Sequence, residues 1–427
     1  MEIVRFPSRA DWPALAKRPT LDVTALFDTV RTVLDRVRQE GDAAVKAYEE
    51  QFDKVILSEL RVSSEETAEA GQAVSEELKA AIQRAKANIE RFHTAQRFQG
   101  VEVETTQGVR CWQKAMPIEK VGLYIPGGTA PLFSTVLMLA VPAHIAGCRE
   151  IVLCTPPDKT TGRVHPAVLY AAQIAGVNKI FKAGGIQAIA AMAYGTESIP
   201  KVYKIFGPGN QYVTAAKQWV SLKEVAIDMP AGPSEVEVVA DQTANPDFIA
   251  ADFLSQAEHG VDSQALLVTT VEALIEPVKE AIERQLTRLP RREITEKALA
   301  HSRIILLRDQ QEVIDFTNLY APEHLILQTV NYAEIAARVE NAGSVFMGAY
   351  TPESAGDYAS GTNHTLPTNG YAKAYSGVNL DSFIKKITFQ EITSEGIRSL
   401  GETIRTMAEG EQLEAHRNAV TVRLNAL

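Results

Sequence analysis

The sequence of 427 residues has few cysteines: only Cys111, Cys148 and Cys154. They form no C-x-x-C pair, and any disulfide scheme would leave one of them unpaired, so a disulfide framework is not expected. This count suits a reducing compartment. A bound metal would have to be held mainly by histidine, carboxylate and amide groups, because no thiolate cluster is available.

The chain also lacks a long apolar run and an excess of basic residues. Its longest apolar stretch, "VLMLAVPA" at 136–143, is far shorter than the ~20 residues needed to cross a bilayer. The N-terminus has charged residues and a proline where a signal peptide would have its apolar segment. The formal net charge of -10 gives no basic footprint for nucleic acid. We therefore expect a cytoplasmic protein with no membrane or nucleic-acid partner.

Helical patterns dominate the first hundred residues and the end of the chain. Apolar residues at helical spacing predict a helix over 23–39. Ser63 and Glu66 form a capping box that opens a second helical stretch, which runs to about Gln96. From Thr393 onward the pattern is again helical, with one apolar stripe that needs a surface on which to dock.

Between these helical parts, short apolar runs alternate with helices. Residues 101–114 first predict a β-hairpin around "TQG". The alternation begins at "VGLYIPGG" and restarts at about Pro246. Such alternation is typical of βαβ units on parallel sheets. Because the chain is too long for one ordinary core, we expect an α/β fold with two parallel-sheet lobes.

Three predicted strand ends carry glycine-rich turns, "YIPGGTAP", "KAGGIQA" and "FGPGNQY". Glycine lets the backbone approach a phosphate, and the following helix N-terminus supplies amide N–H groups. The third turn begins like G-x-G-x-x-G but has Tyr212 in place of the last glycine, although Asp228 lies near the distance expected of a ribose-binding acid. A nucleotide site and ordinary tight turns both remain open.

The stretch "SQAEHG" lies at the end of a predicted helix. Gln256 and His259 are three residues apart and share a helix face, whereas Glu258 is rotated by about 100°. This face offers an amide oxygen and an imidazole together. The alternative is an ordinary helix C-terminus whose histidine interacts with the helix dipole.

A second Glu-His pair, Glu323 and His324, occurs in "APEHL". Pro322 suits the first turn of a helix, where an adjacent carboxylate would complement the dipole. The functional alternative is a pair of general bases, since neutral histidine and ionised glutamate both accept protons near neutral pH.

Two further stretches contain candidate polar groups. "GDYASGTNHTLPT" places Asp357, Asn363 and His364 in a loop that either binds a ligand or is held by internal hydrogen bonds. The tail stretch "EQLEAHRNA" carries Glu411 and His416, and a lone helical histidine is usually an ordinary surface or core residue.

Taken together, several stretches closely resemble the histidinol dehydrogenase family, in the same order from about Val23 to Leu427. They are "YIPGGTAPL", "FGPGNQYVTAAK", "DMPAGPSEV", "DFLSQAEHG", "APEHL", "GDYASGTNHTLPT" and "EAHRNAVTVRLNAL". The resemblance implies a zinc-dependent, NAD-linked enzyme that oxidises L-histidinol through L-histidinaldehyde to L-histidine, the final steps of histidine biosynthesis. It also implies two Rossmann-like lobes in an intertwined homodimer.

The same resemblance assigns roles by motif. His324 would take the protons released as the two hydrides leave, and Glu323 would activate the water that attacks the aldehyde. The implied metal ligands are Gln256, His259, Asp357 and His416. The implied substrate contacts are Ser234, Gln256, His259, His324, Asp357, Glu411 and His416. The implied NAD contacts are Tyr124, Gln187 and Asn210.

We expect the following division of the chain. Residues 1–22 would form an N-terminal helical arm. A first lobe, with the metal and the catalytic residues, would combine 23–123 with 236–378, and 124–235 would form a second lobe on the NAD side. Residues 379–427 would form a tail that crosses to the partner chain, so that its Glu411 and His416 complete the other subunit's site.

Three alternatives remain at this stage. The ligand set does not demand redox chemistry, so a zinc hydrolase that uses Glu323 to activate water is the first. A non-catalytic protein that binds metal or nucleotide on the same fold is the second. The third concerns mechanism: Cys154 follows a predicted strand and is of the right chemistry for a covalent thiohemiacetal, although a packed small residue explains it as well.

Overall fold

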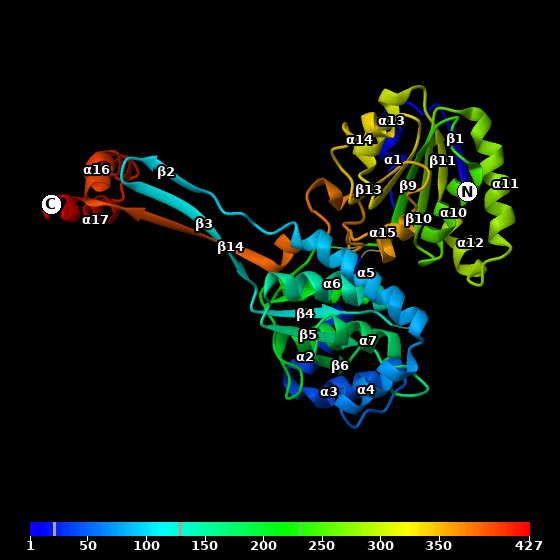
Figure 1. Cartoon of the computed structure of the whole chain (residues 1–427), viewed down its shortest axis with the longest axis horizontal. Coiled ribbons are helices and arrows are strands. Elements are labelled where there is room, and N and C mark those ends of the chain that lie inside the picture. The colour runs from blue at the N-terminus through cyan, green and yellow to red at the C-terminus, as the bar shows by residue number, and fades with distance from the viewer. Residues whose placement is uncertain (20–22, 128–129, 231) are drawn as a thin grey trace.

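The computed structural model describes residues 1–19, 23–127, 130–230 and 232–427. These residues form two α/β lobes and an arm that projects from them (Figure 1). Residues 128, 129 and 231, which belong to two of the quoted motifs, and residues 20–22 of the expected N-terminal arm lie outside the described ranges. In the described ranges, no helix has both the length and the apolar character that a membrane span requires.

The first lobe is built on a six-stranded parallel sheet with the order β1-β11-β10-β9-β12-β13. Its strands are β1 (Glu2–Arg5), β9 (Glu235–Ala240), β10 (Gln264–Thr269), β11 (Arg303–Leu306), β12 (His324–Gln328) and β13 (Ser344–Met347). One face packs against α10 (Pro246–Ala257), α11 (Ile275–Leu286) and α12 (Arg292–Ala300). The other packs against α1 (Trp12–Leu15), α13 (Gln310–Tyr320) and α14 (Tyr332–Ala336).

The second lobe contains a five-stranded parallel sheet with the order β6-β5-β4-β7-β8. Its strands are β4 (Lys120–Tyr124), β5 (Glu150–Thr155), β6 (Lys179–Lys182), β7 (Lys204–Phe206) and β8 (Ala226–Ile227). Helices α4 (Ser64–Ala73), α5 (Glu76–Thr94), α6 (Phe133–Ala146) and α7 (Pro166–Ile174) cover one face. Helices α2 (Phe27–Glu40), α3 (Asp42–Tyr48), α8 (Gly185–Tyr194) and α9 (Gln211–Ser221) cover the other.

The structure divides the chain differently from the expected boundaries. Within the segment expected to be a helical arm, Glu2–Arg5 forms an edge strand of the first sheet, and only the short helix α1 packs beside it on the same lobe. Residues 27–94 pack on the second lobe, because the buried apolar faces of α2 and α5 close the two faces of its sheet. The periodicity of these helices predicts which face is buried but not which sheet receives it.

Local signals from the sequence are found at their predicted positions. Ser63 and Glu66 form the capping box, with hydrogen bonds of 3.1 and 3.0 Å. The stretch expected to be one helix is two, because the backbone is extended at Val74 and Ser75 and the Ser75 side chain caps α5. Strands β2 (Glu102–Thr106) and β3 (Val109–Pro117) form the predicted hairpin.

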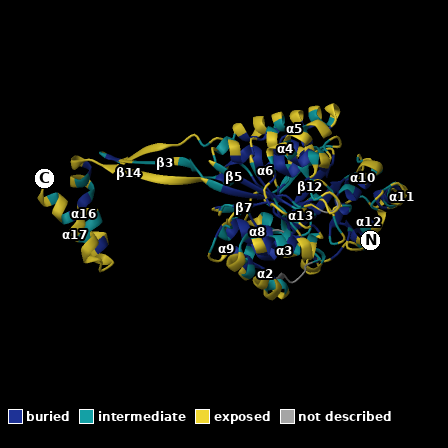
Figure 2. Ribbon diagram, turned by 90° about the horizontal axis from the view of Figure 1, so that it is seen from below, coloured by how far each residue is buried: buried dark blue, intermediate teal, exposed yellow. Residues whose placement is uncertain are grey.

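The projecting arm consists of this hairpin, strand β14 (Ile384–Ile392) and the helices α16 (Ser394–Gly410) and α17 (Glu414–Asn425). Strand β14 pairs antiparallel with β3 along its whole length, and the two helices pack on each other at the far end (Figure 1). Exposed and half-buried residues predominate along the arm, whereas the lobes have buried interiors (Figure 2). The arm thus presents apolar side chains such as Ile387, Ile392 and Met407 to solvent.

Candidate functional site

A cleft of about 650 Å³ separates the two lobes and contains most of the predicted site residues. The second lobe contributes residues that follow its strands, including Gly127 after β4 and Asn210 after β7. The first lobe contributes residues that precede or begin its strands, including Ser234 before β9 and His324 at the start of β12. The rule that ligands bind at the carboxyl ends of parallel strands therefore applies only to the second lobe.

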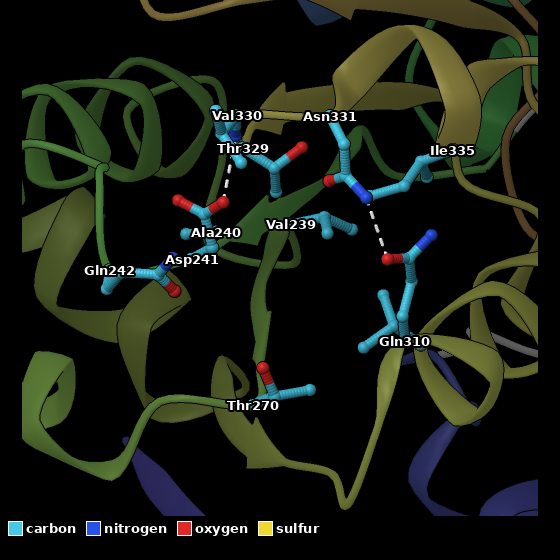
Figure 3. A pocket seen from close by; sticks show the side chains of 11 residues that line it. Val239, Ala240, Asp241, Gln242, Thr270, Gln310, Thr329, Val330, Asn331 and Ile335 are labelled. Atoms are coloured by element: carbon cyan, nitrogen blue, oxygen red, sulfur yellow. Dashed lines mark hydrogen bonds between the residues drawn. The ribbon is translucent and has the colours of Figure 1, made fainter.

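A smaller cavity of about 250 Å³ lies at the opposite end of the first sheet (Figure 3). Several of its polar groups bond to each other: Asn331 Nδ2 donates to Gln310 Oε1 at 2.7 Å, and the Val330 N–H donates to Asp241 Oδ2 at 2.8 Å. Among the described residues that line it there is no predicted site residue. The interlobe cleft is therefore the candidate site.

Glu323 and His324 lie at the start of a strand and not in the first turn of a helix, so that expectation is wrong. Helix α13 ends at Tyr320, and Ala321 has a left-handed backbone with φ 54°. The chain then passes through Pro322 directly into β12. Both side chains of the pair are buried although they border the cleft.

The backbone of Glu235, the first residue of β9, holds both members of this pair. Its N–H donates to Glu323 Oε2 at 2.9 Å, and its carbonyl oxygen lies 3.2 Å from His324 Nδ1. Because a carbonyl can only accept, Nδ1 carries the proton and Nε2 is left as an acceptor. His324 Nε2 is buried and has no hydrogen-bond partner among the described residues.

Burial shifts the pKa values of both groups. Desolvation lowers the pKa of His324 to about 3, so the imidazole is neutral at physiological pH. Desolvation also raises the pKa of Glu323 well above its ordinary value, although the Glu235 N–H acts in the opposite direction. A carboxyl with a raised pKa is a stronger base once it has lost its proton.

Three of the four predicted metal ligands come together at the first-lobe side of the cleft. Gln256 lies in the last turn of α10, His259 lies just beyond it, and Asp357 lies on α15 (Glu353–Tyr358). Asp357 is thus on a helix and not in the expected loop. Ligand atoms of His259, Glu353 and Asp357 all lie within 4.8 Å of one another.

Glu353 is a member of this group that the sequence did not single out. Its side chain is buried, and the Gln256 amide nitrogen lies 2.7 and 3.0 Å from its two oxygens when the Gln256 oxygen faces the Glu235 N–H. That orientation follows from the partners, because an N–H can only donate. The signal that would have found Glu353 is its i, i+4 spacing to Asp357 in "ESAGDY".

The loop after α15 is held by hydrogen bonds, which was one of the two alternatives for it. Asn363 Nδ2 donates to the Met138 carbonyl at 2.6 Å. His364 Nδ1 lies 3.0 Å from the Asp357 carbonyl, and its Nε2 lies 3.1 Å from Thr135 Oγ1. These contacts tie the first lobe to α6 of the second lobe and border the cleft.

The three predicted NAD residues lie at the glycine-rich strand ends of the second lobe. Asn210 lines the cleft and caps α9 through its side-chain oxygen. Tyr124 and Gln187 are buried beside the turn after β6: Tyr124 Oη accepts from the Gly185 N–H at 3.1 Å, and Gln187 Nε2 donates to Glu49 Oε1 at 2.8 Å. These two side chains do not appear among the described residues that line the cleft.

Two other residues considered for the site, Asp228 and Cys154, have structural roles. Asp228 binds Lys217 and accepts from the Gly207 N–H at 2.8 Å, so it already serves to hold the glycine-rich turn. Cys154 is fully buried in the second-lobe core, and burial raises the pKa of its thiol, which disfavours the thiolate that a nucleophile requires.

The tail residues lie apart from the cleft. Glu411 directly follows α16 and His416 lies on α17, and both residues are exposed. These two helices form the far end of the arm (Figure 1), and neither residue is among the described residues that line the cleft. Within one chain, the structure therefore brings together the predicted ligands Gln256, His259 and Asp357 but not His416.

Comparison with known proteins gives consistent matches along the chain. The family model described as histidinol dehydrogenase matches residues 16–424. The histidinol dehydrogenase of Bacteroides thetaiotaomicron is 69% identical over 427 residues, which is 100% of each chain. That of Escherichia coli K12 is 54% identical over 416 residues, covering 97% of this chain and 95% of its own. The crystal structure of histidinol dehydrogenase from Elizabethkingia anophelis matches with a TM-score of 0.97 and 56% identity, covering 100% of this chain and 98% of the other.

Proposed function

Because the chain belongs to the histidinol dehydrogenase family, we propose that it oxidises L-histidinol through L-histidinaldehyde to L-histidine in two NAD-dependent steps. The family match over residues 16–424 is the observation that carries this proposal. The chain is thus an NAD-linked oxidoreductase of histidine biosynthesis. Four electrons leave the substrate as two hydrides. Each hydride reduces one NAD, so two NAD molecules are consumed per histidinol.

His324 is the proposed proton acceptor in both steps. Its imidazole is neutral, and its Nδ1 proton is directed to the Glu235 carbonyl. Its Nε2 atom, beside the cleft, has no hydrogen-bond partner in the part of the chain that the structure describes. Nε2 would take the hydroxyl proton of histidinol as the hydride leaves the adjacent carbon for NAD. It would act again on the aldehyde hydrate, where the second hydride leaves.

Glu323 is the proposed activator of the water that attacks the aldehyde. Its Oε2 atom lies 3.6 Å from His324 Nδ1, so the two side chains are neighbours, and both border the cleft. Burial raises its pKa, which makes its ionised form a stronger base toward water. The interlobe position supports retention of the reactive aldehyde, since an enclosed site excludes bulk water.

Zinc is the proposed metal, with Gln256, His259, Asp357 and the His416 of a second copy as its ligands. The oxygen and nitrogen donors of the first three residues fit a divalent cation, and the grouping of His259, Glu353 and Asp357 supports this position. When bound, zinc would orient the substrate's imidazole and amino groups. Ser234, which lines the cleft, and Glu411 of the second copy would contact the same substrate.

NAD is proposed to bind on the second-lobe side of the cleft, near Tyr124, Gln187 and Asn210. Glycine-rich turns follow the adjacent strands β4 and β7 and also follow β6, which β5 separates from β4. The side chain of Asn210 is at the N-terminus of α9 within the cleft. A helix N-terminus provides amide N–H groups and a favourable dipole for the pyrophosphate.

A homodimer is proposed because the arm exposes apolar side chains that do not pack against the lobes of the same chain. It exposes Ile387, Ile392, Met407 and Leu413, and such side chains on an extended arm favour coverage by a second copy. His416 would then reach the partner's cleft.

The three cysteines are free, which supports a cytoplasmic location.

The test is the stoichiometry of NADH. Zinc-loaded protein is incubated with limiting L-histidinol and excess NAD, and NADH is followed by absorbance; a parallel reaction starts from L-histidinaldehyde. We expect two NADH per histidinol and one per histidinaldehyde. No NADH from a folded, zinc-loaded protein would overturn the proposal and would favour the hydrolytic or non-catalytic alternatives.

A further inference from the structure

A buried arginine from the N-terminal segment lies behind the proposed catalytic pair. Arg18 binds the Glu235 carboxylate with both arms of its guanidinium, from Nε to Oε2 at 2.8 Å and from Nη2 to Oε1 at 2.7 Å. The two side chains are only 9% and 1% exposed. The guanidinium also lies 3.7 Å from the centroid of the Tyr320 ring. This paired fork is the geometry in which arginine holds a carboxylate most rigidly.

The same guanidinium holds the turn that leads to Glu323. Arg18 Nη2 donates to the carbonyl oxygens of Tyr320 and Ala321 at 2.5 and 3.3 Å. These carbonyls lie at the end of α13, where Ala321 adopts its left-handed conformation. A non-glycine residue in that conformation persists only where its surroundings fix it. Arg18 is one of the groups that fix it.

Glu235 connects Arg18 to the catalytic atoms. Its side chain binds Arg18, its N–H binds Glu323 Oε2, and its carbonyl directs the proton of His324. Strand β9 lies beside β12, so a shift of Glu235 would move both hydrogen bonds together. One residue therefore holds the carboxylate and sets the imidazole tautomer.

Stability alone is a poor explanation of this ion pair. Desolvation of two charges offsets most of their attraction, and well-packed apolar residues often stabilise a core as much or more. We infer that Arg18 and Glu235 are positioning residues that hold Glu323 and His324 in their reactive geometry. This inference rests on the roles proposed above for those two residues.

The test compares Arg18→Gln, Arg18→Lys, Glu235→Gln and the double variant Arg18→Gln/Glu235→Gln in the full-length, zinc-loaded protein. Arg308→Gln is the control with the same kinds of partner: Arg308, whose side chain is 49% exposed, also binds one glutamate, Glu312, and two carbonyls of the N-terminal segment. It follows β11, at the end of the sheet opposite the cleft. For each variant, kcat and KM are measured with histidinol and with histidinaldehyde, together with Tm and zinc content.

We expect Arg18→Gln to lower kcat at least tenfold with both substrates, while KM for NAD stays within threefold and zinc content is unchanged. Arg18→Lys keeps the charge but loses the fork, so its kcat should be intermediate. The double variant should recover at least threefold in kcat over Arg18→Gln, because it leaves no unpaired buried charge. Arg308→Gln should keep its kcat whatever its Tm.

The inference is overturned if folded Arg18→Gln keeps the wild-type kcat and loses only Tm, or if the double variant is no better than Arg18→Gln. If Arg18→Gln does not fold, Arg18→Lys decides: a wild-type kcat in that variant overturns the inference equally. In each case the wild type still makes two NADH per histidinol. A wild type that makes none would instead refute the proposed function.

Discussion

The Nε2 atom of His324 lies 3.8 Å from the Oδ1 atom of Asp357. A proposed proton acceptor thus adjoins a proposed metal ligand, although the two residues belong to a strand and a helix that are separate in sequence. The Nε2 atom, which no described residue engages in a hydrogen bond, is within reach of a hydroxyl group bound beside Asp357. This relationship makes the substitution of His324 the most direct test of the proton transfer.

We expect His324→Asn to lower kcat by about 10² to 10⁴ for both histidinol and histidinaldehyde, the usual contribution of a general base. The asparagine amide can still donate to the Glu235 carbonyl, which keeps the local fold. Steady-state NADH formation measures the effect, and the NAD dissociation constant from fluorescence titration serves as the control. A loss confined to NAD binding would contradict the assigned role.

Glu323→Gln should separate the two oxidations. Glutamine still accepts from the Glu235 N–H but does not take a proton from water, so the alcohol step should stay within about fivefold of wild type while the aldehyde step falls by about 10² or more. Single-turnover NADH formation from histidinol and from histidinaldehyde measures each step. An equal loss in both would show that Glu323 has no separate role.

The sequence predicted the helices and strands of this protein better than it predicted which sheet each helix packs against. The alternation of strands and helices, the capping box at Ser63 and the hairpin before β4 all depend on neighbouring residues, and all are present. The choice of sheet for α2 and α5 depends on apolar surfaces far away in sequence. That is why residues 27–94 were expected in the wrong lobe.

In the candidate site too, features that depend on neighbouring residues were predictable and contacts between distant residues were not. Gln256 and His259 share a helix face by their spacing alone, and the structure keeps them together with Asp357. The start of β12 cannot be told from a helix start by its own residues, because a proline before Glu323 suits both. Arg18 had no sequence signal, since its partner Glu235 is 217 residues away. Contacts of that kind become visible only in the folded chain.

Glu353→Ala should weaken zinc binding without removing a proposed ligand. The Glu353 carboxylate holds the Gln256 amide, and loss of such a supporting group usually costs about 10- to 100-fold in metal affinity. Competition with a chromophoric chelator measures the change directly. Asp252→Asn is the control, because Asp252 is also buried near α15 but bonds Gln328. Equal losses in the two variants would argue against a specific role for Glu353.

Glu237 should make the folded protein less stable as the pH rises. This buried carboxyl accepts from Thr317 Oγ1 at 2.6 Å, and desolvation raises its pKa from 4.5 to about 8. Its folded state therefore holds the proton more tightly than the unfolded chain. The stability that comes from this tighter proton binding is fully present below pH 4.5 and is lost as the pH rises to about 8.

Each pH unit in that window costs about 1.4 kcal/mol for one such group, so Glu237→Gln should flatten the dependence of Tm on pH between 5 and 8. The slope is the relevant quantity, because the buried amide also adds a cost that does not depend on pH. Thermal denaturation of both proteins in the same metal-loaded state measures it. Parallel curves for the two proteins would refute the assignment.

Mixing two inactive variants should restore activity if the site is shared between chains. In a shared site, His259→Ala would damage the cleft of its own subunit, whereas His416→Ala would damage the tail that completes the partner's site. In a mixed dimer, one of the two sites would combine an intact cleft with an intact tail. Random exchange makes about half of the dimers mixed, and each mixed dimer has one complete site of two. The activity should therefore recover to about a quarter of the wild-type value. Subunit exchange is induced by mild denaturant and verified with differently tagged chains. Recovery should be absent when each variant is treated alone. If exchange is demonstrated and no activity returns, each chain builds its own site, and the tail of the arm must fold back in solution to reach His259.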